Sequence, residues 1–121
     1  MYTYNAKLIR VVDGDTIIAM VDLGFNTWKQ TNIRFYGIDA YESRTRDLEE
    51  KEKGLKAKQL VIDILEKSNG EFVLKSKGLD KYGRSLGIIF VPVEEAETDS
   101  LDLNQYLINE GLAVPYFGGT R

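Results

Sequence analysis

The chain contains no cysteine and no histidine. The missing cysteines exclude disulfides, thiolate metal sites and cysteine nucleophiles. The missing histidines exclude zinc or iron held by imidazole, Ser-His-Asp relays and the usual general base near neutral pH. Any chemistry must therefore use carboxylates, arginine, lysine, tyrosine and the hydroxyl groups of serine and threonine.

Long hydrophobic runs are also missing. No stretch approaches the ~18 apolar residues that span a bilayer, and residues 1–12 lack the apolar core of a signal peptide. We therefore expect a soluble, intracellular protein, either cytoplasmic or phage-encoded, unless a leader has been removed.

Positive charge is slightly outnumbered, because 16 Lys and Arg oppose 19 Asp and Glu, for a net charge of -3. This balance argues against a general polyanion-coating protein, although a local basic cleft or a bound cation can still handle phosphate. The 121 residues are 43% apolar and 11% aromatic, which is sufficient for a globular core. We expect one domain over residues 1–121.

Five segments are rich in residues that favour β-structure, with turn residues between them. The predicted strands are 6–12, 16–23, 31–38, 71–75 and 85–91. Asp13-Gly14 lies between the first two and predicts a hairpin with a type I′ turn.

Two helices are predicted between and after these strands. From Gly54, apolar residues recur at helical spacing up to Leu65, and Asn69-Gly70 is a stop signal. Residues 43–53 are dense in charge and predict a mobile loop running into that helix. Ser100 or Asp102 can cap the second helix, which Gly111 ends. The order βββ-α-ββ-α favours a mainly β, α+β fold: a five-stranded Greek-key barrel of the OB type with two flanking helices.

Three polar segments are candidates for a site. Residues 13–16 (DGDT) bring two carboxylates to a turn, which suits a hard cation but also suits a plain turn. Residues 33–42 (IRFYGIDAYE) include Arg34 in an apolar strand, where it needs a partner such as Asp39. Residues 80–84 (DKYGR) present donors for a phosphate, or form a solvated turn.

These three motifs, in this order and spacing, resemble those of the staphylococcal nuclease (thermonuclease) family, with the match running from about Lys7 to Tyr116. The resemblance implies a Ca²⁺-dependent nuclease that hydrolyses the phosphodiester bonds of DNA and RNA, preferentially single-stranded, and leaves 3′-phosphates. It also implies a role for each matching residue. Asp15, Asp39 and the carbonyl of Ala40 would bind Ca²⁺. Glu42 would activate the attacking water, and Asp13 would influence the metal. Arg34 and Arg84 would stabilise the phosphoryl transition state, whereas Lys81, Tyr82 and Tyr116 would contact substrate.

The chain departs from the family pattern at two places. Tyr41 stands where the family usually has a proline, so the loop that aims Glu42 loses a fixed φ. The sequence ends at Arg121, before the third helix of the best-known members, so a homodimer or another partner is expected to cover that flank.

Two other functions remain compatible with the sequence. One is a catalytically silent OB-type module that binds nucleic acid or a protein. The other is a structural or regulatory domain in which the Asp and Arg residues form only a buried ion-pair network.

Overall fold

The structure is a computed structural model that describes residues 2–41, 47–92 and 100–116. Its elements, in chain order, are β1 (Thr3–Asp13), β2 (Thr16–Asp22), β3 (Trp28–Phe35), β4 (Ile38–Ala40), α1 (Leu48–Lys67), β5 (Glu71–Leu79), β6 (Ser85–Pro92), β7 (Ser100–Asp102), α2 (Leu103–Asn109) and β8 (Ala113–Pro115). Within the described ranges, no helix is long and apolar enough to cross a membrane.

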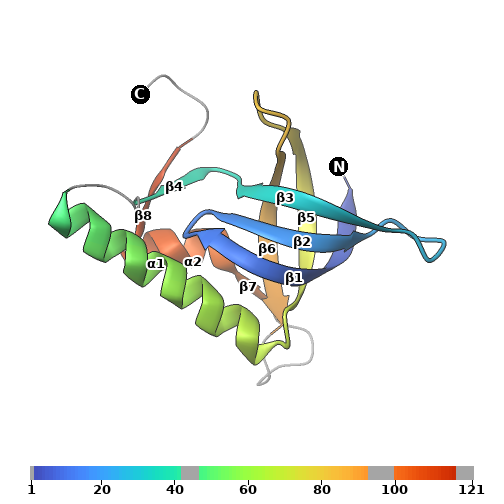
Figure 1. Ribbon diagram of the computed structural model, residues 1–121, viewed down its shortest axis with the longest axis horizontal. Helices are drawn as coiled ribbons and strands as arrows, with labels where there is room; N and C mark the ends of the chain where they lie inside the picture. Colours follow the sequence, from blue (N-terminus) through green and yellow to red (C-terminus); the bar gives the residue numbers. More distant parts are fainter. Residues whose placement is uncertain (1, 42–46, 93–99, 117–121) are drawn as a thin grey trace.

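Five strands close into the predicted barrel, which Figure 1 shows with β1–β3 in front of β5 and β6. The strands pair in the order β3-β2-β1-β5-β6, and each of these pairs is antiparallel. A parallel pairing of β3 with β6, from Ile33↔Ser85 to Phe35↔Gly87, completes the circle. The predicted α+β barrel with two helices is therefore confirmed.

Apolar residues at alternate positions along the strands point into the barrel, where their side chains form the core. Ile17, Ala19, Val21 on β2 and Ile33, Phe35 on β3 are buried, while the residues between them face outward. Helix α1 adds Ala57, Val61 and Leu65 from one face, which is the stripe that the sequence predicted.

Helix α1 begins at Leu48, so the prediction of a loop over 43–53 is wrong for its described part. Asp47 is the N-cap, and its Oδ1 accepts the backbone N–H groups of Glu49 and Glu50 at 3.0 and 3.2 Å. The two glutamates in the first turn also favour a helix start electrostatically. The start of the helix was not predicted because residues 48–53 are mostly charged and add no buried residue to the apolar stripe.

The third predicted strand, 31–38, is wrong in its boundaries. Strand β3 covers Trp28–Phe35, and Gly37, at φ 78, turns the chain into the separate short strand β4. Strand β4 pairs with β8, with Asp39 opposite Val114 and Ala40 opposite Ala113. This small sheet fixes the backbone that carries Asp39 and Ala40.

The buried amide of Asn104 ties α2 to the barrel. Its Oδ1 accepts the Ile89 N–H at 3.1 Å, and its Nδ2 donates to the Tyr36 and Gly87 carbonyls at 2.9 and 3.0 Å. Asn104 is only 4% exposed, so water has little access to replace it as the hydrogen-bond partner of these backbone groups.

We expect Asn104→Ala to lower the free energy of unfolding by about 3 kcal/mol or more, because it leaves buried backbone groups without partners. Urea denaturation of the variant would measure the loss. The control is Asn109→Ala, whose Oδ1 accepts an exposed hydrogen bond from Gln105, and which should change stability by less than about 0.5 kcal/mol. Equal losses from the two variants would contradict this role for Asn104.

Gly14 lies where the β1–β2 turn meets α1. The hairpin is present, but neither Gly14 nor Asp15 has a positive φ, so the predicted type I′ turn is wrong. Glycine is needed here for a different reason. A Cβ at Gly14 would lie 2.7 Å from the Ala57 Cβ and 3.1 Å from the Ala40 Cβ.

We therefore expect Gly14→Ala to cost about 1–3 kcal/mol through overpacking, measured as a lowered Tm and urea midpoint. The double variant Gly14→Ala/Ala57→Gly removes the closest clash, so its loss should be smaller than the sum of the two single losses. Strict additivity would show that the Gly14–Ala57 approach does not limit this position.

Candidate active site

A polar cavity of about 240 Å³ opens at the end of the barrel where β1, β2, β3 and β4 meet. Seven of its lining residues come from the three sequence motifs (Asp13, Asp15, Thr16, Arg34, Asp39, Ala40 and Arg84), and Val12 directly precedes the first motif. The turn, the end of β3, β4 and the β5–β6 connection are far apart in sequence. Barrel closure brings them together, and the parallel β3–β6 pairing places Arg34 opposite Leu86, close to the DKYGR turn.

The Asp15 carboxylate lies in the cavity wall with its side chain 12% exposed, the same fraction as Asp39. Asp15 Oδ1 accepts the Thr16 hydroxyl at 3.1 Å, and its Oδ2 accepts the Ala40 N–H at 3.0 Å. The Asp15 carbonyl also accepts the Phe35 N–H at 2.8 Å. These bonds hold the carboxylate rigidly between the hairpin turn, β3 and β4.

Arg34 joins the two central carboxylates. Its Nη1 lies 3.5 Å from Asp15 Oδ2, and its Nη2 lies 3.4 Å from Asp39 Oδ1. Nη1 also donates to the Phe35 carbonyl at 3.0 Å. The partner that the sequence required for a buried guanidinium is thus a pair of aspartates, and one arginine draws Asp15 and Asp39 to the same cavity wall.

Asp80 holds Arg84 in place at the cavity. Its Oδ2 accepts Arg84 Nε at 2.7 Å, and its Oδ1 accepts the backbone N–H groups of Arg84 and Tyr82 at 2.8 and 2.9 Å. Burial raises the pKa of the Asp80 carboxyl, but these hydrogen bonds outweigh it and hold the pKa below its ordinary value of 3.8. The stabilisation is therefore complete above that value and is lost as the pH falls through the lowered pKa.

This arrangement fixes the direction of Arg84. Asp80 engages Nε and leaves the two terminal nitrogens of the guanidinium out of this ion pair, and Arg84 lines the cavity. These terminal nitrogens form the fork that binds a phosphate bidentately. Asp80 is a positioning residue that the sequence analysis did not assign, although its place four residues before Arg84 in the same turn was the available signal.

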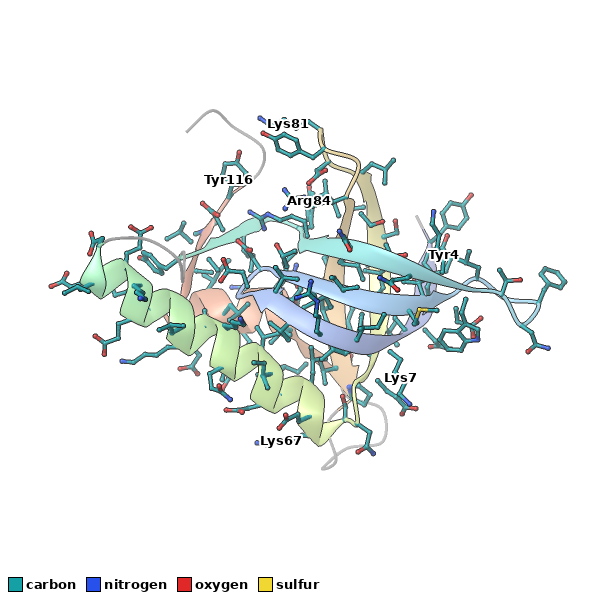
Figure 2. The ribbon with its side chains drawn as sticks, in the orientation of Figure 1. Tyr4, Lys7, Lys67, Lys81, Arg84 and Tyr116 are labelled. Carbon is teal, nitrogen blue, oxygen red and sulfur yellow. The ribbon has the colours of Figure 1, made fainter. Side chains whose placement is uncertain are left out.

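The substrate-binding residues predicted from the resemblance lie outside this lining. Tyr82 is 73% exposed on the turn, with Lys81 Nζ 5.2 Å and Arg84 Cζ 5.6 Å from its ring centre. Tyr116 follows β8, and its N–H donates to the Gly37 carbonyl at 2.8 Å. Figure 2 shows Lys81, Arg84 and Tyr116 on the same upper side of the barrel. Glu42 lies outside the described residues.

Thr16 and Asp13 complete the turn side of the cavity. The Thr16 hydroxyl orients Asp15, a role that the DGDT motif alone did not reveal. Asp13 Oδ1 accepts the Gly14 N–H at 3.0 Å. Asp13 adds a third carboxylate to the cavity lining and raises its negative charge.

The donor set fits a hard divalent cation. Within residues 2–41, 47–92 and 100–116, no three acidic residues gather as a ready-made metal cluster. However, Asp15 and Asp39 face one guanidinium from a shared wall, and Ala40 lines the same cavity. Carboxylate and carbonyl oxygens are the ligands that Ca²⁺ prefers, and water completes its shell in proteins. With no histidine or cysteine in the chain, softer metals are disfavoured.

Comparisons with known proteins agree with the geometry. A family profile described as "Staphylococcal nuclease homologue" matches residues 32–120. Relatives include a "Micrococcal nuclease" of Shigella flexneri (29% identical, 93% of this chain and 59% of that protein). A "Thermonuclease" of Staphylococcus hyicus is 31% identical over 88% of this chain and 56% of that protein. "Protein ParB" of Escherichia coli is 28% identical over 93% of this chain and 57% of that protein. The chain thus spans somewhat more than half the length of these relatives.

Proposed function

Because the chain belongs to the staphylococcal nuclease family, we propose that it is a Ca²⁺-dependent nuclease that hydrolyses phosphodiester bonds of DNA and RNA. The observation that carries the proposal is the single cavity lined by Asp15, Arg34, Asp39 and Arg84. Two carboxylates for a cation and two arginines for a phosphate are a set of groups that supports phosphodiester hydrolysis without histidine.

The cation site of this proposal consists of Asp15, Asp39 and the carbonyl of Ala40. Ca²⁺, when bound there, supplies positive charge beside the phosphoryl group. Asp15 is suited to the role because Thr16 and Ala40 already fix both of its oxygens. A ligand held in this way loses little further freedom when the ion binds.

The two arginines act on the phosphate from different walls of the cavity. Arg34 carries the positive charge nearest the carboxylates, so it binds the phosphate in the ground state as well as later. Arg84, held at Nε by Asp80, directs its terminal nitrogens to oxygens that gain charge as water attacks phosphorus. Such preorganised donors need no rearrangement at the moment of reaction.

The proton of the attacking water goes to Glu42 in this mechanism. Water adds to phosphorus, the bond from phosphorus to the 5′-oxygen breaks, and that oxygen takes a proton from solvent to leave as a hydroxyl, while the other product strand keeps a 3′-phosphate. This role comes from the family resemblance and from the place of Glu42 two residues after Ala40, which lines the cavity. Lys81, Tyr82 and Tyr116 then contact neighbouring phosphates or bases.

One observation favours a second candidate, a structural or regulatory domain in which these residues only hold the fold together. Arg34 already forms ion pairs with Asp15 and Asp39, as a purely structural network would. A network of this kind should take up no Ca²⁺, whereas the nuclease should.

The test uses DNA and RNA oligonucleotides of one sequence, incubated with the purified protein and Ca²⁺. The nuclease proposal expects both to be cut, with phosphate on the 3′ ends of the products. Binding of both oligonucleotides without cleavage, by protein that is folded and supplied with Ca²⁺, would favour the catalytically silent binding module instead.

A further inference from the structure

A second hollow, larger than the site cavity, lies on the outer face of the barrel. It has a volume of about 370 Å³ and is lined by Lys7, Leu8, Ile9, Met20 and Trp28. Trp28 is 47% exposed and Ile9 is 46% exposed, so this apolar surface is open to solvent. We call it the Trp28 groove.

Strand register creates the groove. Met20 lies opposite Lys7 and Trp28 opposite Asp22, on the face away from the buried Ala19 and Val21. A bulge in β1 between Leu8 and Arg10 inserts Ile9 as an additional residue. The bulge therefore adds apolar surface to the outside of a barrel whose other apolar residues mostly face its interior.

The same register connects the groove to the site cavity. The outward residues of β3 are Trp28, Gln30, Asn32 and Arg34, and the last of these lines the cavity. At ~3.3 Å per residue, Trp28 is roughly 20 Å from Arg34 along the strand. Gln30 and Asn32 are exposed amides that offer both donors and acceptors between the two ends.

Two exposed cations on this face offer contacts to a polyanion, although the whole chain is acidic and the exposed Glu71 lies opposite Lys7 on β5. Lys7 lines the groove, and Arg10 lies opposite Ile18 between the groove and the cavity. Both are exposed, and neither has a carboxylate within ion-pair distance among the described residues. Asp22, at the far end, has its Oδ1 engaged by the Gly24 N–H at 2.8 Å.

We infer that the Trp28 groove binds single-stranded nucleic acid that continues beyond the bond cleaved in the cavity. A base stacks on Trp28 against Met20 and Ile9, while Lys7 and Arg10 bind phosphates along the way to Arg34. An exposed aromatic ring beside unpaired cations is the combination that binds single strands without sequence preference. A duplex keeps its bases paired, so it offers no free base to this ring. The inference depends on the proposed function, since it extends the substrate of that site.

Figure 2 shows Lys7 of the Trp28 groove on another part of the surface than the other proposed contacts. Lys7 is at the lower right, whereas Lys81, Arg84 and Tyr116 are in the upper part of the view. A strand that reaches the groove therefore gains contacts in addition to those at the cavity. A dinucleotide can reach only the cavity, and a longer strand reaches the groove as well.

The test compares a single-stranded oligonucleotide of about 12 nucleotides with a dinucleotide. We expect Trp28→Ala to raise KM for the longer substrate about 10-fold, with kcat/KM for the dinucleotide unchanged. Trp28→Phe should restore most of the affinity because it keeps a ring. The matched control is Phe25→Ala, which removes a fully exposed ring from the same β2–β3 hairpin but not from the groove lining.

Intrinsic fluorescence gives a readout that does not depend on cleavage. Trp28 is the single tryptophan of the chain, so stacking of a base should quench its emission with the longer strand and not with the dinucleotide. Quenching without cleavage would contradict the proposed nuclease activity and would still support the groove as a surface that binds nucleic acid. Cleavage of both substrates with no quenching, and with Trp28→Ala equal to wild type, would overturn the groove and leave the nuclease. Emission that changes with protein concentration alone would assign the groove to a second copy of the chain and overturn the inference.

Discussion

Arg84→Ala is expected to lower kcat for cleavage of single-stranded DNA by about 10²–10³-fold, because it removes a preorganised donor from the developing phosphoryl charge. The fold should survive. Asp80 keeps its bonds from the backbone N–H groups of Tyr82 and Arg84, and these do not depend on the Arg84 side chain. Steady-state kinetics and thermal unfolding of the same preparation would measure both effects.

Two further variants separate charge from geometry. Arg84→Lys keeps the charge but loses the fork and the Nε contact with Asp80, so most of the rate loss should remain. Lys81→Ala removes the neighbouring cation, which lies outside the cavity lining, and should raise KM with little change in kcat. A lysine at position 84 that restored the wild-type rate would show that any positive charge suffices there, contrary to the role assigned to Arg84.

Asp39→Asn is expected to abolish most Ca²⁺ binding and to reduce activity by about 100-fold or more at fixed Ca²⁺. The amide is close in size to the carboxylate and keeps one oxygen, but it lacks the charge that holds the ion. Arg34 retains its contact with Asp15 at 3.5 Å, so the cavity wall should remain in place. Calorimetric titration with Ca²⁺ would measure the affinity, and kinetics over a range of Ca²⁺ would measure the rate.

The matched control for this change is Asp63→Asn on α1. Asp63 is an exposed aspartate whose Oδ1 accepts the Gln59 side-chain amide at 2.8 Å, away from the cavity. Its replacement should change neither Ca²⁺ affinity nor rate. Unchanged Ca²⁺ affinity in Asp39→Asn would instead mean that Asp15, Arg34 and Asp39 form a structural ion-pair network.

Much of the barrel could be predicted because its signals are local. Alternation along β2 and β3, the hairpin at Asp13-Gly14 and the stripe that ends at Leu65 each come from a short segment. The order of these elements along the chain, βββ-α-ββ-α, predicted the barrel.

The errors occur where tertiary contacts decide the structure. The turn at Gly14 is set by the close approach of Ala57, which no local pattern reveals. The short strand β4 exists because β8, more than seventy residues later, pairs with it. Helix α1 begins at Leu48 because the Asp47 cap and the following glutamates stabilise a turn that has no apolar face.

Part of the candidate site could also be predicted from local motifs, and part depends on the folded structure. Asp15, Arg34, Asp39, Ala40 and Arg84 were named from three motifs, and all of them line one cavity. Thr16 and Asp80, which orient Asp15 and Arg84, were not assigned, because hydrogen bonds of this kind depend on the folded turn. The Trp28 groove could not be predicted without the register of β1–β3, since its lining residues come from three separate strands.

The central claim is that this cavity hydrolyses phosphodiesters with the help of Ca²⁺ and a carboxylate base. The most direct measurement follows cleavage of single-stranded DNA with Ca²⁺, then with excess chelator, then with Ca²⁺ restored, beside a Glu42→Gln variant. We predict cleavage that stops with the chelator, returns with the ion and is lost in the variant. Cleavage that continues at the same rate in the chelator, or in Glu42→Gln, would contradict the account.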